Sequence, residues 1–477
     1  MPLARDPGYC RNCLAKQQVI DRLTEEIQRL KSKLHRQERT AREEPFGEST
    51  PSSKRLVKIS STPEARSRIG GAKPGHQGHG RSSVCHADAD EIERLDAQEC
   101  CPQCGGQLVE WGERTRTVHD CEPVRRKTRL VRIAEAHCPC CRKTFRRKPS
   151  DVLPRSICSN RLVAQAAVWH YVDGLTMGHV SRQLDISTAT LTGRMHALAS
   201  ILEPAVKVLI DDYRKAPVKH ADETGWRCDG ANGYTWGFFT QSISIFCCRH
   251  TRSGAVAREI LGEGVAGQDT LIVDRYGGYN KYTGDIQYCY EHLKRDTRKI
   301  VKDNPGDHEC AAFDEQFTPL LRDAMRLRNQ AQDQETFRTR ADEIKAAIKA
   351  CVDKTARHPS IQHIQNIFRE QEHRLFHWAE SPDIPAENNR AERELRPLVI
   401  ARKTSFGSQS EKGLKTREIL MSVLNTLAKR TDNVVTAISS ALDALVANPL
   451  LDVAEHLLAR PGDPAARLLA RANNQQG

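Results

Sequence analysis

The 477-residue sequence contains no apolar run near the length of a membrane span, which takes about 20 apolar residues in a row. Only 38% of its residues are hydrophobic. The first segment, MPLARDPGYCRNC, also lacks the apolar core of a secretory signal. These absences argue against a membrane protein and against export. We therefore expect a soluble, cytoplasmic protein, which in a bacterium lies at the nucleoid.

Cysteine is not scarce, but the 17 cysteines do not indicate a disulfide framework, because disulfides are rare in a reducing compartment. Their spacing indicates metal instead. Two CxxC pairs within residues 98–150 can hold a structural, tetrahedral Zn²⁺. The predicted ligands are Cys101, Cys104, Cys138 and Cys141. The long spacer and the neighbours Cys100 and Cys140 leave this choice open, and the isolated pair Cys10 and Cys13 is either half of an intermolecular zinc site or incidental.

Basic residues exceed acidic ones, 73 against 61, and the formal net charge is +12. Such a surplus favours a polyanionic partner, and double-stranded DNA is the one we expect. The alternative is a soluble protein that is merely basic. Clustering supports DNA, since RRKTRLVR (125–132) and RKTFRRK (142–148) lie close together. The DNA contacts predicted from these clusters are Arg125, Arg126, Lys127, Arg146 and Arg147.

The chain is too long for one ordinary core, so we expect several units. Residues 14–40 form a short heptad seam, which predicts a coiled coil that pairs two or more chains. The alternative is an amphipathic helix docked on its own chain. Residues 41–97 are rich in Pro, Gly, Ser and Lys, and we predict a flexible basic linker.

Residues 156–210 are predicted to be helical. Within them, MGHVSRQLDISTATLTGRMHAL reads as a helix, a short turn and a second helix that opens at Ser187. This pattern is typical of a helix-turn-helix, with Thr190 and Arg194 placed to contact DNA. An ordinary helical hairpin inside a bundle is the alternative.

Residues 215–292 alternate short apolar runs with Gly and Asn, in the order strand, strand, strand, helix, strand, strand. This order predicts a mixed sheet with helices packed on it. Residues 293–380 then read as a charged helical insertion. Residues 386–430 return to an amphipathic helical pattern, and 431–477 form a helical tail.

Three acids between residues 215 and 397 suit phosphodiester chemistry. Asp222 and Asp274 follow apolar strand residues, although either alone is more typical of a turn or a cap. Glu392 lies in AENNRAERELRP (386–397), where helical spacing aligns it with Asn389 and Arg396. Converging carboxylates can hold two Mg²⁺ ions that clamp the attacking and leaving oxygens. The alternative for Glu392 is an exposed ion pair with Arg396.

At these residues the chain resembles a DDE-class insertion-sequence transposase of the insertion-sequence-sixty-six family. The resemblance lies in the heptad seam, the linker, the four-cysteine module, HADETGW, IVDRYGGYNKY, CYEHLKRD and ENNRAERELRPLVIARKTSFGS. It implies a multidomain protein whose α/β RNase H-like catalytic core carries a helical insertion. The coiled coil, the zinc-binding module and the helix-turn-helix-like domain precede that core.

Carried onto this sequence, the resemblance implies that Asp222, Asp274 and Glu392 bind Mg²⁺ or Mn²⁺. His292 and Arg295 match a motif near the active site and are assisting candidates. Arg396, Arg402 and Lys403 join the predicted DNA contacts. The chain departs from the family pattern at Glu387, where Asp is usual, so Glu387 competes with Glu392 as the third ligand.

The implied activity is binding of the terminal inverted repeats of an insertion sequence, followed by metal-dependent strand cleavage and strand transfer. Two-metal hydrolysis frees a 3′-hydroxyl, which then attacks target DNA by transesterification. The implied partners are the element ends, target DNA, a second copy of the chain joined by the coiled coil, and accessory proteins of the element. Two alternatives stay open: a non-catalytic DNA-binding regulator, and a metal-dependent nuclease that cuts without joining.

Overall fold

A computed structural model describes residues 126–459, apart from 134, 138–139, 142–143, 147–148 and 331–332. The predicted coiled coil (14–40), the linker (41–97) and most of the zinc-binding module lie outside the described residues. So do the predicted ligands Cys101, Cys104 and Cys138. No helix in the described part of the chain is both long and apolar enough to cross a membrane.

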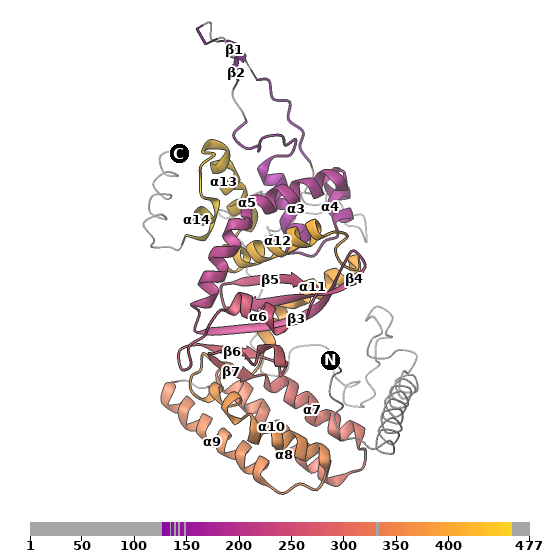
Figure 1. Cartoon of the computed structure of the whole chain (residues 1–477), viewed down its shortest axis with the longest axis vertical. Coiled ribbons are helices and arrows are strands. Elements are labelled where there is room, and N and C mark those ends of the chain that lie inside the picture. Colours follow the sequence, from indigo (N-terminus) through magenta and orange to yellow (C-terminus); the bar gives the residue numbers. More distant parts are fainter. Residues whose placement is uncertain are drawn as a thin grey trace, which may run out of the picture. The chain divides into compact units, whose positions relative to one another are not determined.

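A five-stranded mixed sheet forms the centre of the described fold (Figure 1). Its strands are β3 (Val218–Cys228), β4 (Ala231–Phe239), β5 (Ser244–Arg249), β6 (Thr270–Val273) and β7 (Asp285–Tyr288). They lie in the order β5-β4-β3-β6-β7. β3, β4 and β5 are antiparallel neighbours, whereas β6 and β7 run parallel to β3. Helix α6 (Gly254–Leu261) connects β5 to β6, so the predicted element order is confirmed.

The edge strand β5 is covered by helix α12 (Glu411–Arg430) (Figure 1). An edge strand presents unpaired backbone groups, and each one that is buried without a partner is costly. Here α12 supplies the partners from side chains one turn apart. The backbone amides of Ser244, Phe246 and Cys248 donate to Thr426 Oγ1, Ser422 Oγ and Glu418 Oε2, each at 2.9 Å. The polar side chains buried along α12 therefore extend the sheet's hydrogen bonding.

Three helices precede the sheet: α3 (Asn160–Tyr171), α4 (Met177–Leu184) and α5 (Thr188–Arg214). α4 ends at Asp185, whose φ of 50° is left-handed, a common way to stop a helix. Ser187 then caps α5 by accepting from the amide of Thr190 at 3.2 Å. The predicted sequence of helix, short turn and helix opening at Ser187 is confirmed.

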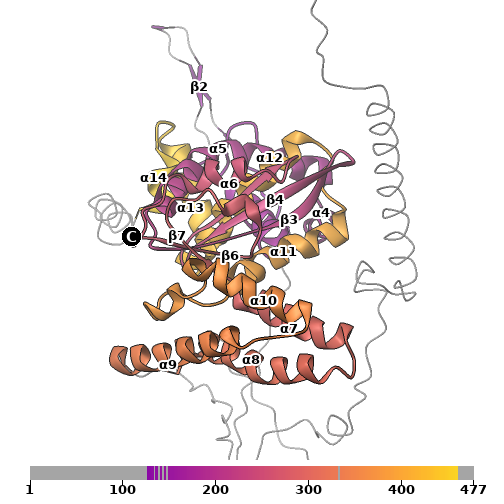
Figure 2. The ribbon, with the colours of Figure 1, turned by 60° about the horizontal axis from the view of Figure 1, so that its bottom comes forward.

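The helices after the sheet begin with α7 (Tyr290–Asp303), α8 (His308–Leu327), α9 (Gln334–Asp353) and α10 (Pro359–Glu370), which pack together in Figure 2. Two short 3₁₀ turns, η4 (Glu372–Arg374) and η5 (His377–Ala379), lead back to β7. Buried aromatic rings join this group to the sheet end, because Tyr290 contacts both Phe368 and Trp378. Residues 293–380 are thus helical, as predicted.

Helix α11 (Asn389–Ser405) then packs on β3 and β4, and α12, α13 (Val434–Ala447) and α14 (Val453–Leu458) complete the described chain. The predicted helices at the C-terminal end are confirmed as far as residue 459. Near the start, β1 (Glu135–His137) and β2 (Thr144–Arg146) form a small antiparallel hairpin.

Replacing Ser422 with Ala should lower the free energy of unfolding by about 1–3 kcal/mol, because the amide of Phe246 would be left buried without a partner. Ser422 is fully buried. Ser440→Ala, an exposed Ser on α13, is the matched control and should change stability by less than about 0.5 kcal/mol. Urea unfolding followed by tryptophan fluorescence makes the comparison. Equal effects of the two substitutions would contradict the edge-capping role.

Candidate active site

The parallel pairing of β3 with β6 brings Asp222 and Asp274 to the same level of the sheet. Val218 pairs with Thr270 and His220 with Ile272, and the same offset sets Asp222 beside Asp274. Neighbouring strands lie about 4.8 Å apart, so the two carboxylates are close. Asp274 directly follows the last residue of β6, as expected.

The position of Asp222 differs from the sequence expectation in one respect. We expected it near a strand end, whereas β3 continues through Cys228 because β4 goes on pairing with it. On the β6 side, however, pairing with β3 stops at His220. Asp222 is thus paired with β4 but lies beyond the last residue that pairs with β6.

Glu392 reaches these aspartates because α11 packs closely on the sheet. The residue opposite Asp222 on β4 is Gly237. A Cβ atom at Gly237 would lie 3.0 Å from Leu395 Cδ2 of α11 and 2.3 Å from the ring of Phe239. Glycine at this position therefore permits the close approach of α11, whose first turn carries Glu392.

Asn388 fixes where α11 begins, immediately before the helix. The residue is only 1% exposed. Its Nδ2 donates to the carbonyl of Ala221 at 2.8 Å, and its Oδ1 lies 2.9 Å from His220 Nδ1. Because that oxygen can only accept, the ring donates. The backbone amide of Asn388 also donates to Cys289 Sγ at 3.1 Å. One amide thus ties the start of α11 to β3, on the side of the strand next to Asp222.

The three predicted acids interact electrostatically. Burial raises the pKa of Asp222 to about 7, and the negative charges of Glu223, Asp274 and Glu392 add to this increase, partly offset by the hydrogen bond from the Glu223 amide. Like charges held this close favour the protonated form of one of them. The cluster is therefore an acidic site that a bound cation would stabilise.

A fourth acid, Glu223, lies beside this cluster and is already paired with a cation of the fold. Its side chain is 2% exposed and pairs with Arg252, whose Nε donates to Oε1 at 2.9 Å. The hydroxyl of Tyr279 donates to its other oxygen at 2.6 Å. Because successive side chains of a strand point to opposite faces, Glu223 projects away from the face of Asp222. Sequence reasoning did not single it out, although its adjacency to Asp222 was a signal.

Glu392 forms an ion pair, but not with the predicted alternative Arg396. Arg295 Nη2 donates to Glu392 Oε1 at 2.6 Å, so α7 and α11 meet at this acid. His292 lies three residues before Arg295 on the same face of α7. Its Nδ1 is buried and has no hydrogen-bond partner among the described residues. Of the two assisting candidates, Arg295 thus contacts the acidic cluster, and His292 lies about one turn before it on α7.

Glu387 lies in a different environment from Glu392. Burial raises its pKa, while the positive charges of Arg328 and Arg393 lower it. Its Oε2 is buried and has no hydrogen-bond partner in the described residues. Glu392 is among the charges that act on Asp222, and Glu387 is not.

The residues predicted to contact DNA are only partly available in this structure. Arg126 forms an ion pair with Asp185 at 2.9 Å, and Lys127 is exposed. At the start of α5, Thr190 Oγ1 lies 2.9 Å from Ser187 Oγ and Arg194 donates to the carbonyl of Arg155 at 3.2 Å. These contacts position the helix start without burying it.

The remaining predicted contacts lie on and near α11. Arg402 is engaged within the fold, since its Nη1 donates to the carbonyl of Gly225 at 2.6 Å. Arg396 and Lys403 are exposed. Arg125, Arg147 and the side chain of Arg146 lie outside the described residues. Of the predicted zinc ligands, only Cys141 is described, and it is exposed in the turn between β1 and β2.

The acids fit a hard divalent cation, because carboxylate oxygens are the ligands Mg²⁺ and Mn²⁺ prefer. Another group, Asp307, Cys310 and His358, has ligand atoms within 4.8 Å of one another. There, however, Asp307 Oδ1 accepts from the amide of Cys310 and His358 Nδ1 accepts from the amide of Ser360. Those two atoms cap α8 and α10, so this group is explained by the fold.

Three antiparallel strands followed by two parallel ones, with acids from β3, the end of β6 and a later helix, fit an RNase H-like core of a nucleic-acid-processing enzyme. Comparison with protein families matches residues 155–416 to the family described as Transposase IS66 family. The match covers more than half of the chain, so the chain belongs to this family and has a transposase domain. The resemblance inferred from the motifs is confirmed. A search of curated proteins found no match.

Replacing Asp222 with Asn should stabilise the metal-free protein above about pH 7. The folded-state pKa of about 7 exceeds the unfolded value of about 4, so the folded protein binds the extra proton between these pH values. Stability contributed by the protonated carboxyl is therefore lost as pH rises through this window. The gain in Asp222→Asn should be on the order of 2–4 kcal/mol at pH 8 and vanish near pH 4.

Urea unfolding in EDTA at several pH values measures this gain. Asp342→Asn, an exposed acid on α9, is the control and should show no such pH dependence. Adding Mg²⁺ should stabilise the wild type and leave Asp222→Asn unaffected. A pH-independent effect of Asp222→Asn would refute the unneutralised acidic cluster.

Proposed function

We propose that this protein is a DNA transposase that binds the terminal inverted repeats of its insertion sequence and cleaves and transfers DNA strands with Asp222, Asp274 and Glu392. The observation that supports this most is the convergence of three acids from β3, β6 and α11. Membership of the transposase family agrees with it. The cytoplasm, beside the chromosome, is where such an enzyme would act.

Asp222, Asp274 and Glu392 would hold divalent ions, Mg²⁺ or Mn²⁺. Such ions, when bound, polarise the scissile phosphate and increase the acidity of a water or of a 3′-hydroxyl next to it. The protein's part is to hold the three acids in place, and the bound ions would favour their deprotonated form. Asn388 and Gly237 set the position of α11, and through it the position of Glu392.

Arg295 and His292 would assist from α7. Arg295 orients the carboxylate of Glu392 and neutralises part of the charge of the cluster before metal binds. Its remaining N–H groups can bind a phosphate oxygen of the DNA. The buried and unpaired Nδ1 of His292 is suited to a polar group that arrives with the substrate.

We assign Glu392 rather than Glu387 as the third ligand. Of these two glutamates, only Glu392 is among the charges that raise the pKa of Asp222. The charges that act on Glu387 are instead those of Arg328, Arg393 and Glu291. In this proposal Glu387 supports the packing of the segment before α11.

Binding of the element ends would involve α4 and the start of α5, with Lys127, Arg396 and Lys403 on exposed surface. The structural zinc at Cys101, Cys104, Cys138 and Cys141 would shape a further DNA-binding module. The coiled coil over 14–40 would join two chains so that both element ends are held. Accessory proteins of the element would complete the assembly.

The decisive experiment uses purified full-length protein, a labelled duplex that carries the repeat flanking the gene, and Mg²⁺. Wild type should cut at the repeat boundary and join the free end to a target duplex. Asp222→Asn and Glu392→Gln should lower both rates by at least about 1000-fold, because removal of one metal ligand disables the site. Both variants should keep end binding within about threefold of wild type.

Glu387→Gln is the matched control and should retain most of the cleavage rate. If Glu387→Gln is inactive and Glu392→Gln active, the third ligand has been misassigned. If wild type cuts but never joins, the protein is a nuclease. Binding without cutting, also when accessory proteins are present, would identify a DNA-binding regulator.

A further inference from the structure

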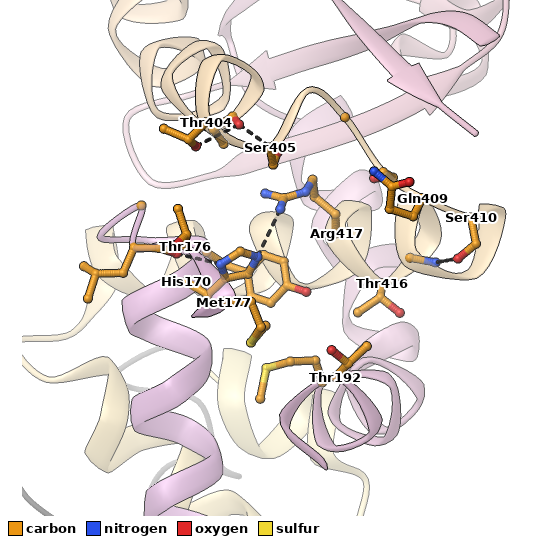
Figure 3. Close-up of a pocket in the computed structure, with 18 of the residues that line it drawn as sticks. His170, Thr176, Met177, Thr192, Thr404, Ser405, Gln409, Ser410, Thr416 and Arg417 are labelled. Atoms are coloured by element: carbon orange, nitrogen blue, oxygen red, sulfur yellow. Dashed lines mark hydrogen bonds between the residues drawn. The ribbon is translucent and has the colours of Figure 1, made fainter. Parts of the chain in front are cut away.

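A cavity of about 300 Å³ lies between α4 and α5 on one side and α11 and α12 on the other. Figure 3 shows side chains from all these segments pointing into it, with Arg417 at its centre. Arg417 belongs to the second turn of α12, whose N-cap, Ser410, also lines the cavity. We call this cavity the Arg417 pocket.

The guanidinium of Arg417 is buried without a counter-ion in the described part of the chain. The residue is only 8% exposed. Its hydrogen bonds go to His170 Nε2 at 3.1 Å and, more weakly, to Met421 Sδ at 3.8 Å. Among the described residues, no carboxylate forms an ion pair with it. The rings of Tyr171 and Trp226 lie 5.2 and 5.0 Å from its Cζ and stabilise the cation only in part.

His170 does not supply negative charge either. Its Nδ1 lies 2.7 Å from the carbonyl of Leu175 and therefore carries the proton. Burial, with the nearby charge of Arg417, lowers the pKa of His170 to about 4, so the ring is neutral. Its Nε2 accepts from Arg417 and orients the guanidinium without neutralising it.

The acids of α12 face elsewhere. Glu411 pairs with His250 at 2.8 Å, and Glu418 pairs with Arg249 at 3.2 Å. Neither lines the pocket, and no other Asp or Glu of the described residues does. A buried charge without a partner is costly, so the lack of an anionic side chain around Arg417 among residues 126–459 as described requires an explanation.

The rest of the lining suits an anion. Hydroxyl-bearing residues surround the cavity, namely Thr176, Thr192, Thr404, Ser405, Ser408, Ser410 and Thr416. The N-terminus of α12 adds the positive end of its helix dipole. Thr192, Thr404 and Ser405 donate their hydroxyl hydrogens to helix carbonyls, whereas the hydroxyls of Thr176, Ser408 and Ser410 accept within the fold. A bound phosphate could therefore accept from the guanidinium and from these last three hydroxyls.

The place of the pocket in the fold favours DNA as the source of that phosphate. Thr192 comes from the first turns of α5, where DNA contact is proposed. Ser405 ends α11, which carries Glu392 in its first turn, so the pocket lies about 20 Å along this helix from the acid. Between Ser405 and Gly407, both lining residues, Phe406 is 77% exposed, as a ring that stacks on a base would be.

We propose that the Arg417 pocket binds one backbone phosphate of the element-end DNA on the path from the helix-turn-helix to the catalytic acids. This inference rests on the proposed function in that DNA is the ligand. The pocket takes a phosphate group through Arg417 and the surrounding hydroxyls. It positions the strand and is not part of the chemistry.

A methylphosphonate scan tests the proposal with full-length protein and the flanking-repeat duplex, in which one phosphate at a time is made neutral. At one position the neutral linkage should weaken wild-type binding by about tenfold or more. Arg417→Met should bind this duplex and the unmodified one equally, while still losing affinity at the other contacted phosphates. Arg340→Met, which removes an exposed charge from α9, should keep the wild-type pattern. If every neutral linkage that weakens wild-type binding also weakens binding by Arg417→Met, the proposal is wrong.

Thermal unfolding without DNA separates a ligand site from a structural role and from misfolding. Arg417→Met should melt at or above the wild-type temperature, because it removes an uncompensated buried charge. A large decrease would identify a structural arginine and overturn the proposal. Inorganic phosphate alone should raise the wild-type melting temperature at most slightly. A large rise that Arg417→Met abolishes would show that the pocket binds free phosphate. If, in addition, no DNA phosphate in the scan depends on Arg417, DNA is not the source of the phosphate and the proposal is overturned.

The same measurements separate failure of this inference from failure of the proposed function. If wild type does not bind the flanking repeat at all, the proposed function fails, and the phosphate titration then decides whether the pocket holds an anion. If wild type binds and cuts but no phosphate depends on Arg417, the function stands and this inference fails.

Discussion

The arrangement of the acids depends on one buried amide, the side chain of Asn388. It is hydrogen-bonded on both ends, to His220 and to the carbonyl of Ala221, while its own backbone amide donates to Cys289. A buried amide that lost these partners would be costly, so the junction is strongly specified. It joins β3, the beginning of α7 and the beginning of α11. Burial keeps His220 neutral by lowering its pKa to about 3, so this ring places no positive charge next to the acids.

The helical group α7 to α10 separates Asp274 from Glu392 in sequence and also brings them together in space. Its first helix leaves the sheet directly after β7 and carries Arg295, which pairs with Glu392. Its end returns through η4 and η5 to the sheet, where the amide of Trp378 donates to Gln287 at 3.1 Å. The chain can then begin α11 beside β3. The insertion therefore contributes one wall of the candidate active site.

Most buried charges of the described fold have partners, which sets Arg417 apart. Lys219 is fully buried and donates to Asp269 at 2.8 Å. Lys429 pairs with Glu394 at 2.6 Å and also donates to the carbonyl of Ile243 at 2.8 Å. These pairs keep their charges satisfied within the fold. In the described fold Arg417 contacts only uncharged groups: the imidazole of His170, the rings of Tyr171 and Trp226, and the thioether of Met421. A fold that pairs its other buried cations leaves this one open toward a cavity lined with hydroxyls.

Much of the fold followed from local patterns. Short apolar runs with Gly and Asn between them predicted all five strands of the central sheet, and Ser187 marked the start of α5 because a helix cap depends on neighbouring residues. Asp222 and Asp274 could be selected because each follows apolar strand residues, and Glu392 because helical spacing aligns it with Asn389 and Arg396. Assigning Glu392 over Glu387 from sequence rested on its helical neighbours and on the family's Glu-Arg pair.

The sequence by itself thus determined the element order, the basic character and the candidate acids, since these depend on residue type and on spacing over a few positions. Only the tertiary structure decided which groups meet. It paired Glu392 with Arg295 rather than with Arg396, placed Asn388 against Ala221, and gave Arg417 no counter-ion within the described fold. The physical reason is that hydrogen bonds and ion pairs between distant segments depend on strand register and helix packing. The periodicity of residue types along the chain does not predict those partners.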